Sequence, residues 1–282
     1  MIENLFLSVG AMKAGTTWLY EQLKTHPRIY STPEKEIHYF EQVSGRSNPI
    51  SYSKRRDRMI QVLADKNQSF VSNNIQKIQW YIHFGQEEII NDVWYQRLFE
   101  EAAQRPDIYC ADYSNLYSLL EHKGWERVRQ NCKRLRVIYT LRDPLSRIWS
   151  HYKFHLQFTG LGDRIIESGT DRFKGMLDND WFWNHACYDQ CLERLNKFLS
   201  KEELKIFYFE DFRNKPQDSL NELCNFLEIE AFQLNPSSDK AINASPEISM
   251  PAEWEEIARE KLRPTLTNLY SRGINHESWN VE

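Results

Sequence analysis

The stretch LFLSVGAMKAGTTW, residues 5–18, decides the fold that we expect for this chain. Its apolar beginning predicts a buried strand at 5–9, and a helix is predicted over 16–24 because a proline at position 27 prevents it from continuing. Residues 10–15 therefore leave the carboxyl end of a strand and enter a helix. At such a place, unpaired backbone N–H groups and the positive end of the helix dipole together hold an anion.

Three side chains of this loop fit the same purpose. Lys13 adds a full positive charge, and the hydroxyls of Thr16 and Thr17 are suited both to capping the helix and to donating hydrogen bonds to phosphate or sulfate oxygens. The loop is a shortened relative of the Walker phosphate-binding loop. The alternative is an ordinary strand–helix turn with Lys13 in solvent.

Strands and helices continue to alternate along the rest of the chain. Strands are predicted at 108–111, 136–141 and 204–208, and helices at 94–104, 119–132, from 143–144 onward, and at 186–199, 216–227 and 252–270. Such alternation predicts an α/β fold with a central, mainly parallel sheet flanked by helices. Since no repeat, low-complexity tract or flexible linker interrupts it, we expect residues 1–282 to form a single domain.

A second anion site is predicted at the end of the strand 136–141. Arg142 follows this strand, at the sheet edge where ligands bind in doubly wound folds. Ser150 lies eight residues further along the predicted helix, on the same side, and a guanidinium with a hydroxyl suits a phosphate group. The alternative is that Arg142 pairs with Asp143 or a neighbouring carboxylate and that Ser150 is only a surface residue.

Composition excludes several classes of protein. The 282 residues contain 36 basic and 40 acidic side chains, a net charge of −4, which disfavours nucleic acid and an anionic membrane as partners. No stretch approaches the length of a membrane span or resembles a signal peptide. The five cysteines form no CxxC pair and no zinc-type cluster, so a reduced, cytoplasmic protein is expected, with Cys187 and Cys191 as packing residues.

Three motifs, in order and spacing, resemble those of the sulfotransferases that use 3′-phosphoadenosine 5′-phosphosulfate (PAPS). They are KAGTTW at 13–18, PEKEIHYF at 33–40 and LRDPLSRIWSHY at 141–152. The resemblance implies a P-loop-like three-layer α/β fold, PAPS as the donor and 3′,5′-bisphosphoadenosine (PAP) as its product. Carried over by position, the 5′-phosphosulfate would bind to Lys13, Ala14, Gly15, Thr16, Thr17 and Trp18, and the 3′-phosphate to Arg142 and Ser150.

The resemblance also implies catalytic roles. Sulfuryl transfer depends on positioning and electrostatics, with no metal ion required, and Lys13 would stabilise the charge that develops on the leaving phosphate. Glu36 occupies the glutamate position of the branch that resembles heparan and bacterial sulfotransferases, so it is the candidate general base, and His38 is the reserve. The alternative is that Glu36 merely pairs with Lys35 or Arg28 in a charged loop.

The chain departs from the family pattern in two places. Residues 110–114, CADYS, lack the lysine that related glycan enzymes carry there, which leaves Asp112 as a possible contact to the acceptor. The loop that closes over the nucleotide in many members is not evident around Lys240, to which no role is assigned. Lys35 is a second candidate for contact with the phosphosulfate.

The acceptor group is expected to be a hydroxyl or an amine, carried by a small molecule or a short neutral sugar. An acidic chain is a poor match for a sulfated polysaccharide. The aromatic runs 80–84, 94–95 and 181–183 are suited to lining a pocket for an uncharged or cationic molecule, although core packing is the simpler role for any one of them. The alternatives to this function are a P-loop kinase or NTPase that uses ATP and Mg²⁺, and a non-catalytic nucleotide-binding protein. Nothing in the sequence indicates an oligomeric state.

Overall fold

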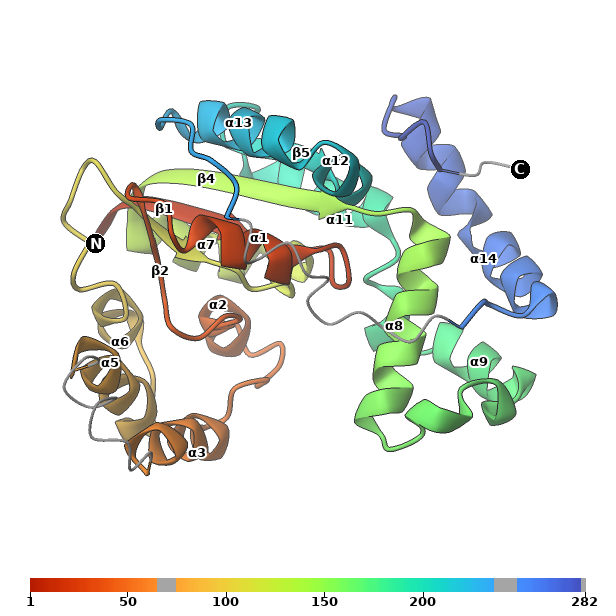
Figure 1. Cartoon of the computed structure of the whole chain (residues 1–282), viewed down its shortest axis with the longest axis horizontal. Coiled ribbons are helices and arrows are strands. Elements are labelled where there is room, and N and C mark those ends of the chain that lie inside the picture. The colour runs from red at the N-terminus through yellow and green to blue at the C-terminus, as the bar shows by residue number, and fades with distance from the viewer. Residues whose placement is uncertain (65–74, 236–247, 280–282) are drawn as a thin grey trace.

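Five parallel strands form the central sheet, in the order β2-β3-β1-β4-β5 (Figure 1). The computed structural model describes residues 1–64, 75–235 and 248–279. The strands are β1 (Ile2–Ser8), β2 (Ile29–Ser31), β3 (Tyr109–Asp112), β4 (Cys132–Leu141) and β5 (Leu204–Tyr208). Every neighbouring pair is parallel, which confirms the expected sheet.

Helices cover both faces of this sheet. Phe6 and Ile138 point to one face, where they join a core with α1 and α13, whereas Leu5 and Val137 point to the other and pack with α7 and α11. This alternation follows from the two-residue period of a strand. The three-layer α/β fold is therefore confirmed. The helices are α1 (Thr16–Leu23), α2 (Tyr39–Val43), α3 (Tyr52–Leu63), α5 (Ile75–Gln86), α6 (Asp92–Arg97), α7 (His122–Asn131), α8 (Pro144–Phe158), α9 (Thr170–Leu177), α10 (Asp180–Trp183), α11 (Tyr188–Phe198), α12 (Phe209–Asn214), α13 (Pro216–Leu227) and α14 (Ala252–Ser271), with 3₁₀ turns at Tyr117–Leu119, Gly162–Arg164 and Ile166–Ser168.

Helix α8 leaves the carboxyl end of β4 and runs away from the sheet (Figure 1). Asp143 caps it by accepting a hydrogen bond of 2.7 Å from the N–H of Ser146, and Pro144 opens its first turn. Helices α8, α9 and α14 share an apolar cluster built around Tyr152, Phe173 and Trp254. Within the described ranges, no helix is both long and apolar enough to cross a bilayer.

The boundaries differ from the prediction where local patterns are weak. Neither the three-residue strand β2 nor the helix α3 was predicted. The helix predicted at 94–104 begins at Asp92 and ends at Arg97, with Asn91 as its N-cap. Strand β4 begins at Cys132, where a helix was predicted, because register pairing with β1 extends it backward to that residue.

Candidate active site

The carboxyl ends of all five strands lie at one edge of the parallel sheet, and the segment after each strand contributes to one site. The loop after β1 carries Lys13, and the segment after β2 carries Glu36. The segments after β3, β4 and β5 begin close to Asn115, Arg142 and Phe209. The convergence follows from topology, since parallel strands bring these ends together.

The loop between β1 and α1 presents free backbone donors. Gly15 is the N-cap of α1 in the left-handed conformation (φ 80°), and no side chain caps this helix. The first helical hydrogen bond runs from Leu19 N–H to the Gly15 carbonyl, at 3.1 Å. The N–H groups of residues 16–18 therefore have no intrahelical partner. A Cβ at Gly15 would lie 2.8 Å from the Phe209 ring, so the loop also needs glycine for space.

The structure brings Lys13 and Arg142 together. The Nη1 of Arg142 donates to the Lys13 carbonyl at 3.0 Å, and its guanidinium lies 4.6 Å from the centre of the Phe209 ring. The Nζ of Lys13 lies 4.2 Å from the centre of the Phe154 ring on α8. Thus Lys13 is not a free surface lysine. Arg142 does not pair with Asp143, whose carboxylate caps α8.

Burial and like charge act together on these two cations. Burial, followed by the charge of Arg142, lowers the pKa of Lys13, and burial lowers the pKa of Arg142. Lys35 also acts on the Lys13 ammonium in the same direction. Several cations held this close are unfavourable by themselves and become favourable when an anion binds between them.

The other predicted donor-binding residues lie along α1 and α8. Thr16 is 6% exposed and Ser150 is 8% exposed, while Thr17 is half-buried. The Trp18 ring packs on Phe212, with ring centres 5.6 Å apart. Ala14 is buried and its N–H already donates to the Ala11 carbonyl, at 3.1 Å. Ala14 therefore shapes the loop, and its own amide is engaged within it.

Glu36 lies in a network of hydrogen bonds. One carboxylate oxygen accepts from Lys35 Nζ and from Asn115 Nδ2, both at 2.8 Å, and the other lies 3.7 Å from His38 Nε2. Burial alone would raise the pKa of Glu36, but hydrogen bonding to His38 and the charge of Lys35 outweigh it and lower the pKa to about 2. Glu36 is thus ionised at neutral pH. Arg28, the other partner considered for it, pairs with Asp107 and Glu230.

Asp112 is a supporting residue and does not face an acceptor. It is fully buried, and its carboxylate accepts from Ser114 Oγ at 2.5 Å, from Tyr117 OH at 2.9 Å and from Tyr95 OH at 3.1 Å. Ser114 in turn accepts from the N–H of His38, at 2.9 Å. The suggestion that Asp112 contacts the acceptor is therefore wrong. Its carboxylate accepts hydrogen bonds from buried neighbours, and through Ser114 it holds the segment that carries His38.

Backbone strain is concentrated on the proposed catalytic residues. Among the described residues other than glycine, four have a positive φ: Lys13 (69°), Glu36 (65°), His38 (51°) and Glu228 (59°). Three of these four are the residues singled out for catalysis. Such strain costs about 1–3 kcal/mol per residue and persists where function requires the geometry.

A cavity of about 330 Å³ opens beside Glu36 and His38. Its walls are completed by Met12, Ser47, Asn48, Pro49, Asn115, Leu116 and Trp181. Of the aromatic runs expected to line a pocket, Trp181 borders this cavity, and it is 49% exposed. The runs 80–84 and 94–95 pack in the core instead, because their rings stack on one another and on Tyr39.

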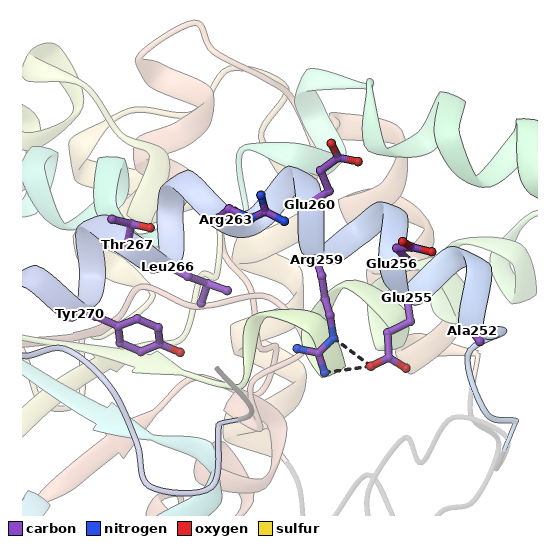
Figure 2. Close-up of a pocket in the computed structure, with 9 residues that line it drawn as sticks. All are labelled: Ala252, Glu255, Glu256, Arg259, Glu260, Arg263, Leu266, Thr267 and Tyr270. Carbon is purple, nitrogen blue, oxygen red and sulfur yellow. Dashed lines mark hydrogen bonds and ion pairs between the residues drawn. The ribbon is translucent and has the colours of Figure 1, made fainter. Parts of the chain in front are cut away.

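A second hollow, of about 670 Å³, runs along α14 (Figure 2). Figure 2 shows that its described walls come from one helix, with Glu255 paired to Arg259. It contains three glutamates and two arginines, and none of the predicted site residues. It therefore offers no concentrated positive charge to an anion. Lys240 lies outside the described residues.

A direct prediction about titration follows from the lowered pKa of Glu36. In a ¹³C NMR titration of the carboxyl groups, Glu36 should stay ionised well below the ordinary glutamate pKa of about 4.3, and its contribution to stability should be lost only as the pH falls toward about 2. In Lys35→Met, the titration midpoint should move upward, because a stabilising positive charge is removed. A wild-type midpoint in the ordinary range, unchanged in Lys35→Met, would contradict the observed network.

Comparison with protein families identifies one family, and comparison with solved structures identifies similar folds. The model of the family described as "Sulfotransferase family" matches residues 6–233. A sulfotransferase from Alicyclobacillus acidocaldarius has a similar structure, with a TM-score of 0.65, 19% identity and 99% of each chain covered. A sulfotransferase domain from the curacin biosynthetic pathway has a TM-score of 0.53 and 17% identity, over 93% of this chain and 98% of that one. No curated protein sequence gave a significant match.

Proposed function

Since the chain belongs to the sulfotransferase family, we propose that it transfers the sulfuryl group of PAPS to a hydroxyl group of a small acceptor. One observation carries this proposal: the anion-binding loop after β1 and Arg142 at the end of the adjacent strand β4 are joined by the hydrogen bond from Arg142 to the Lys13 carbonyl. Two neighbouring positively charged sites, at Lys13 and at Arg142, suit a nucleotide that is negatively charged at both its 5′ and 3′ ends. The family match favours this chemistry over an ATP-dependent kinase.

The residues present fit such a donor. The free N–H groups of residues 16–18, the Lys13 ammonium and Lys35 would hold the phosphosulfate. Arg142, with Ser150 further along α8, would hold the 3′-phosphate. Trp18 borders the same loop and offers an apolar surface beside it.

The bound donor supplies an electrophilic sulfur: the acceptor oxygen bonds to it as the sulfur–oxygen bond to the phosphate breaks, and the electron pair leaves with the phosphate. Negative charge grows on that phosphate oxygen in the transition state, and Lys13 therefore stabilises the transition state more strongly than it stabilises the ground state. Glu36, beside the cavity, accepts the proton of the acceptor hydroxyl. His38 orients the Glu36 carboxylate from 3.7 Å and is the reserve candidate for the base.

Lys35 links donor binding to the basicity of Glu36. While Lys35 pairs with Glu36, the low pKa makes Glu36 a weak base. We propose that the negative donor competes for the Lys35 ammonium. Loss of that pairing raises the pKa of Glu36 toward the range in which a general base is effective.

The acceptor cavity fits a small molecule or a short sugar. Its volume of about 330 Å³ lies at the lower end of ligand pockets, and Trp181 with Asn48 and Asn115 offers one ring surface and amide groups. We further propose that residues 1–282 form one sulfotransferase domain. The five buried thiols, none in a disulfide, support a reducing compartment such as the cytoplasm.

The role of Arg142 is tested with two nucleotides. In Arg142→Gln, the affinity for PAP should fall by about 10- to 100-fold, since a charge-assisted hydrogen bond contributes about 1.5–3 kcal/mol. The affinity for adenosine 5′-monophosphate, which lacks the 3′-phosphate, should hardly change. Isothermal titration calorimetry measures both.

Arg134→Gln is the matched control, because Arg134 lies on the same strand but pairs with Glu228 at the surface. It should bind both nucleotides as the wild type does. If Arg142→Gln weakened both nucleotides equally, or neither, Arg142 would not be the 3′-phosphate residue.

A further inference from the structure

Beside Trp181, which lines the acceptor cavity, lies a cluster of three buried basic side chains that the proposed reaction does not use. Arg147 and His151 lie one turn apart on α8, and His185 follows α10. Arg147 and His151 are 0% exposed to solvent, and His185 is 1% exposed. The rings of His151 and His185 face each other edge to face, with centres 5.9 Å apart.

Most of the polar atoms in this cluster lack a partner. The Nη1 of Arg147 lies 3.3 Å from His151 Nδ1, but Nε and Nη2 of Arg147 have no hydrogen-bond partner in the described structure. The same is true of Nε2 of His151 and of both ring nitrogens of His185. Unpartnered buried donors are rare, and each costs about 1–3 kcal/mol.

The charge of Arg147 is also unbalanced. The groups that act on it most strongly are Tyr139, Tyr188, Cys187 and Cys191. Burial raises the pKa of Tyr188 and of the Cys187 thiol, so these groups are neutral and supply no negative charge. A water molecule would satisfy the free N–H groups but would not balance the guanidinium.

Burial and the charge of Arg147 lower the pKa of both histidines, that of His185 to about 3. Both imidazoles are therefore neutral, and the cluster carries a single positive charge. The nearby charges that act on the histidines are themselves basic: Lys13 and His155 on His151, and Arg46 and His38 on His185. The cluster itself therefore favours one negative charge.

Trp181 connects the cluster to the acceptor cavity. Its ring centre lies 5.2 Å from that of His151 and 6.1 Å from that of His185, and the residue lines the cavity together with Glu36 and His38. Phe182 stacks on His151 from 4.3 Å and is fully buried. Trp181 thus contacts both the cavity and the cluster, and because none of the three cluster side chains lines the cavity itself, a group in the cavity reaches them only past the Trp181 ring.

We propose that Arg147, His151 and His185 bind a carboxylate carried by the acceptor, which makes the substrate class small hydroxy acids. This inference rests on the proposed sulfotransferase function and specifies its acceptor. One planar carboxylate matches one guanidinium fork, and the single N–H of each neutral imidazole donates to its remaining lone pairs. A multiply charged group would exceed the single charge available. The neutral acceptor expected from the composition is thereby replaced by a monoanionic one.

The test compares hydroxy acids with their primary amides on the full chain saturated with PAP. Glucuronate with glucuronamide, and 4-hydroxybenzoate with 4-hydroxybenzamide, are titrated while the imidazole resonances of ¹⁵N-labelled protein are recorded. The acids should shift the His151 and His185 resonances saturably, and the amides should not. With PAPS, kcat/KM should favour each acid over its amide by about 10- to 100-fold, the worth of a hydrogen bond to a charged group.

Two variants keep the test independent of folding at one position. Arg147→Met, of similar length and apolar, and His185→Gln should each reduce the preference for acid over amide to near unity, with PAP affinity unchanged. His155→Gln is the matched control, since it removes a histidine of α8 outside the cluster and should keep the preference.

The outcomes separate the two proposals. Failure of the wild type to bind PAP would remove the sulfotransferase function itself. PAP binding with equal responses to acids and amides would overturn only the carboxylate site. Equal histidine shifts with chloride, together with equal turnover of acids and amides, would overturn it as well, because the cluster would then hold a free anion.

Discussion

Lys13→Ala lowers kcat for sulfuryl transfer by about 10²- to 10³-fold, the usual effect of removing one donor that stabilises a developing negative charge. The KM for PAPS rises much less, because the backbone N–H groups at the start of α1 and Arg142 continue to hold the nucleotide. The reason is the differential action of the ammonium: it meets most of its charge only as the phosphate leaves. Steady-state kinetics with a radiolabelled sulfuryl donor separates the two constants.

Lys24→Ala is the matched control for this prediction. Lys24 lies at the other end of α1 and pairs with Glu21 at the surface. Its substitution removes one positive charge, as Lys13→Ala does. It should keep wild-type kcat. If Lys13→Ala raised KM with kcat unchanged, Lys13 would contribute only uniform binding and its transition-state role would be wrong.

Glu36→Gln lowers kcat by about 10²- to 10⁴-fold, the range typical of a lost general base. The amide keeps the size of the side chain and is able to accept from Lys35 and Asn115, so the loop should stay in place. It has no basic oxygen to take the hydroxyl proton. PAP affinity measured by calorimetry should remain within a few-fold of the wild type.

Two further variants make this result specific. Glu34→Gln removes a carboxylate two residues away, one that bonds to Tyr81 and should leave kcat unaffected. His38→Gln distinguishes the two candidates for the base: a moderate loss is expected if His38 only orients Glu36. Near-normal activity of Glu36→Gln beside an inactive His38→Gln would assign the base to His38.

The fold and half of the site follow from the sequence because they depend on local patterns and on one topological rule. The apolar runs that became β1 and β4 are long, and Asp143 with Pro144 marks the start of α8. Once two strands are parallel neighbours, the loops after them must meet, which places Lys13 beside Arg142.

The remaining features depend on contacts between distant segments, which no local pattern indicates. Strand β2 has three residues, and its pairing with β3 is what brings Glu36 within reach of Asn115, 79 positions along the chain. Asn115 was missed, although its place just after β3 is a usable signal once the strand order is known. Asp112 was interpreted as a possible contact to the acceptor. Its role is decided by its burial, and burial depends on the fold, so the local sequence could not indicate it.

The acceptor-binding part of the site could not be predicted from local sequence either. Three aromatic runs were equally suited to a pocket, and only packing separates Trp181 from the rings of α5 and α6. The net charge of −4 suggested a neutral or cationic acceptor. We propose a monoanionic acceptor instead because Lys13, Arg142 and Arg147 are concentrated at one sheet edge and along the helix that leaves it.

The most direct test of the account is a crystal structure of the protein bound to PAP. We expect the 5′-phosphate against the N–H groups of residues 16–18 and the Lys13 ammonium, and the 3′-phosphate against Arg142 and Ser150, with Glu36 facing the 5′ end across the cavity. Nucleotide bound elsewhere, for example in the hollow along α14, with Lys13 and Arg142 free of phosphate, would contradict the account.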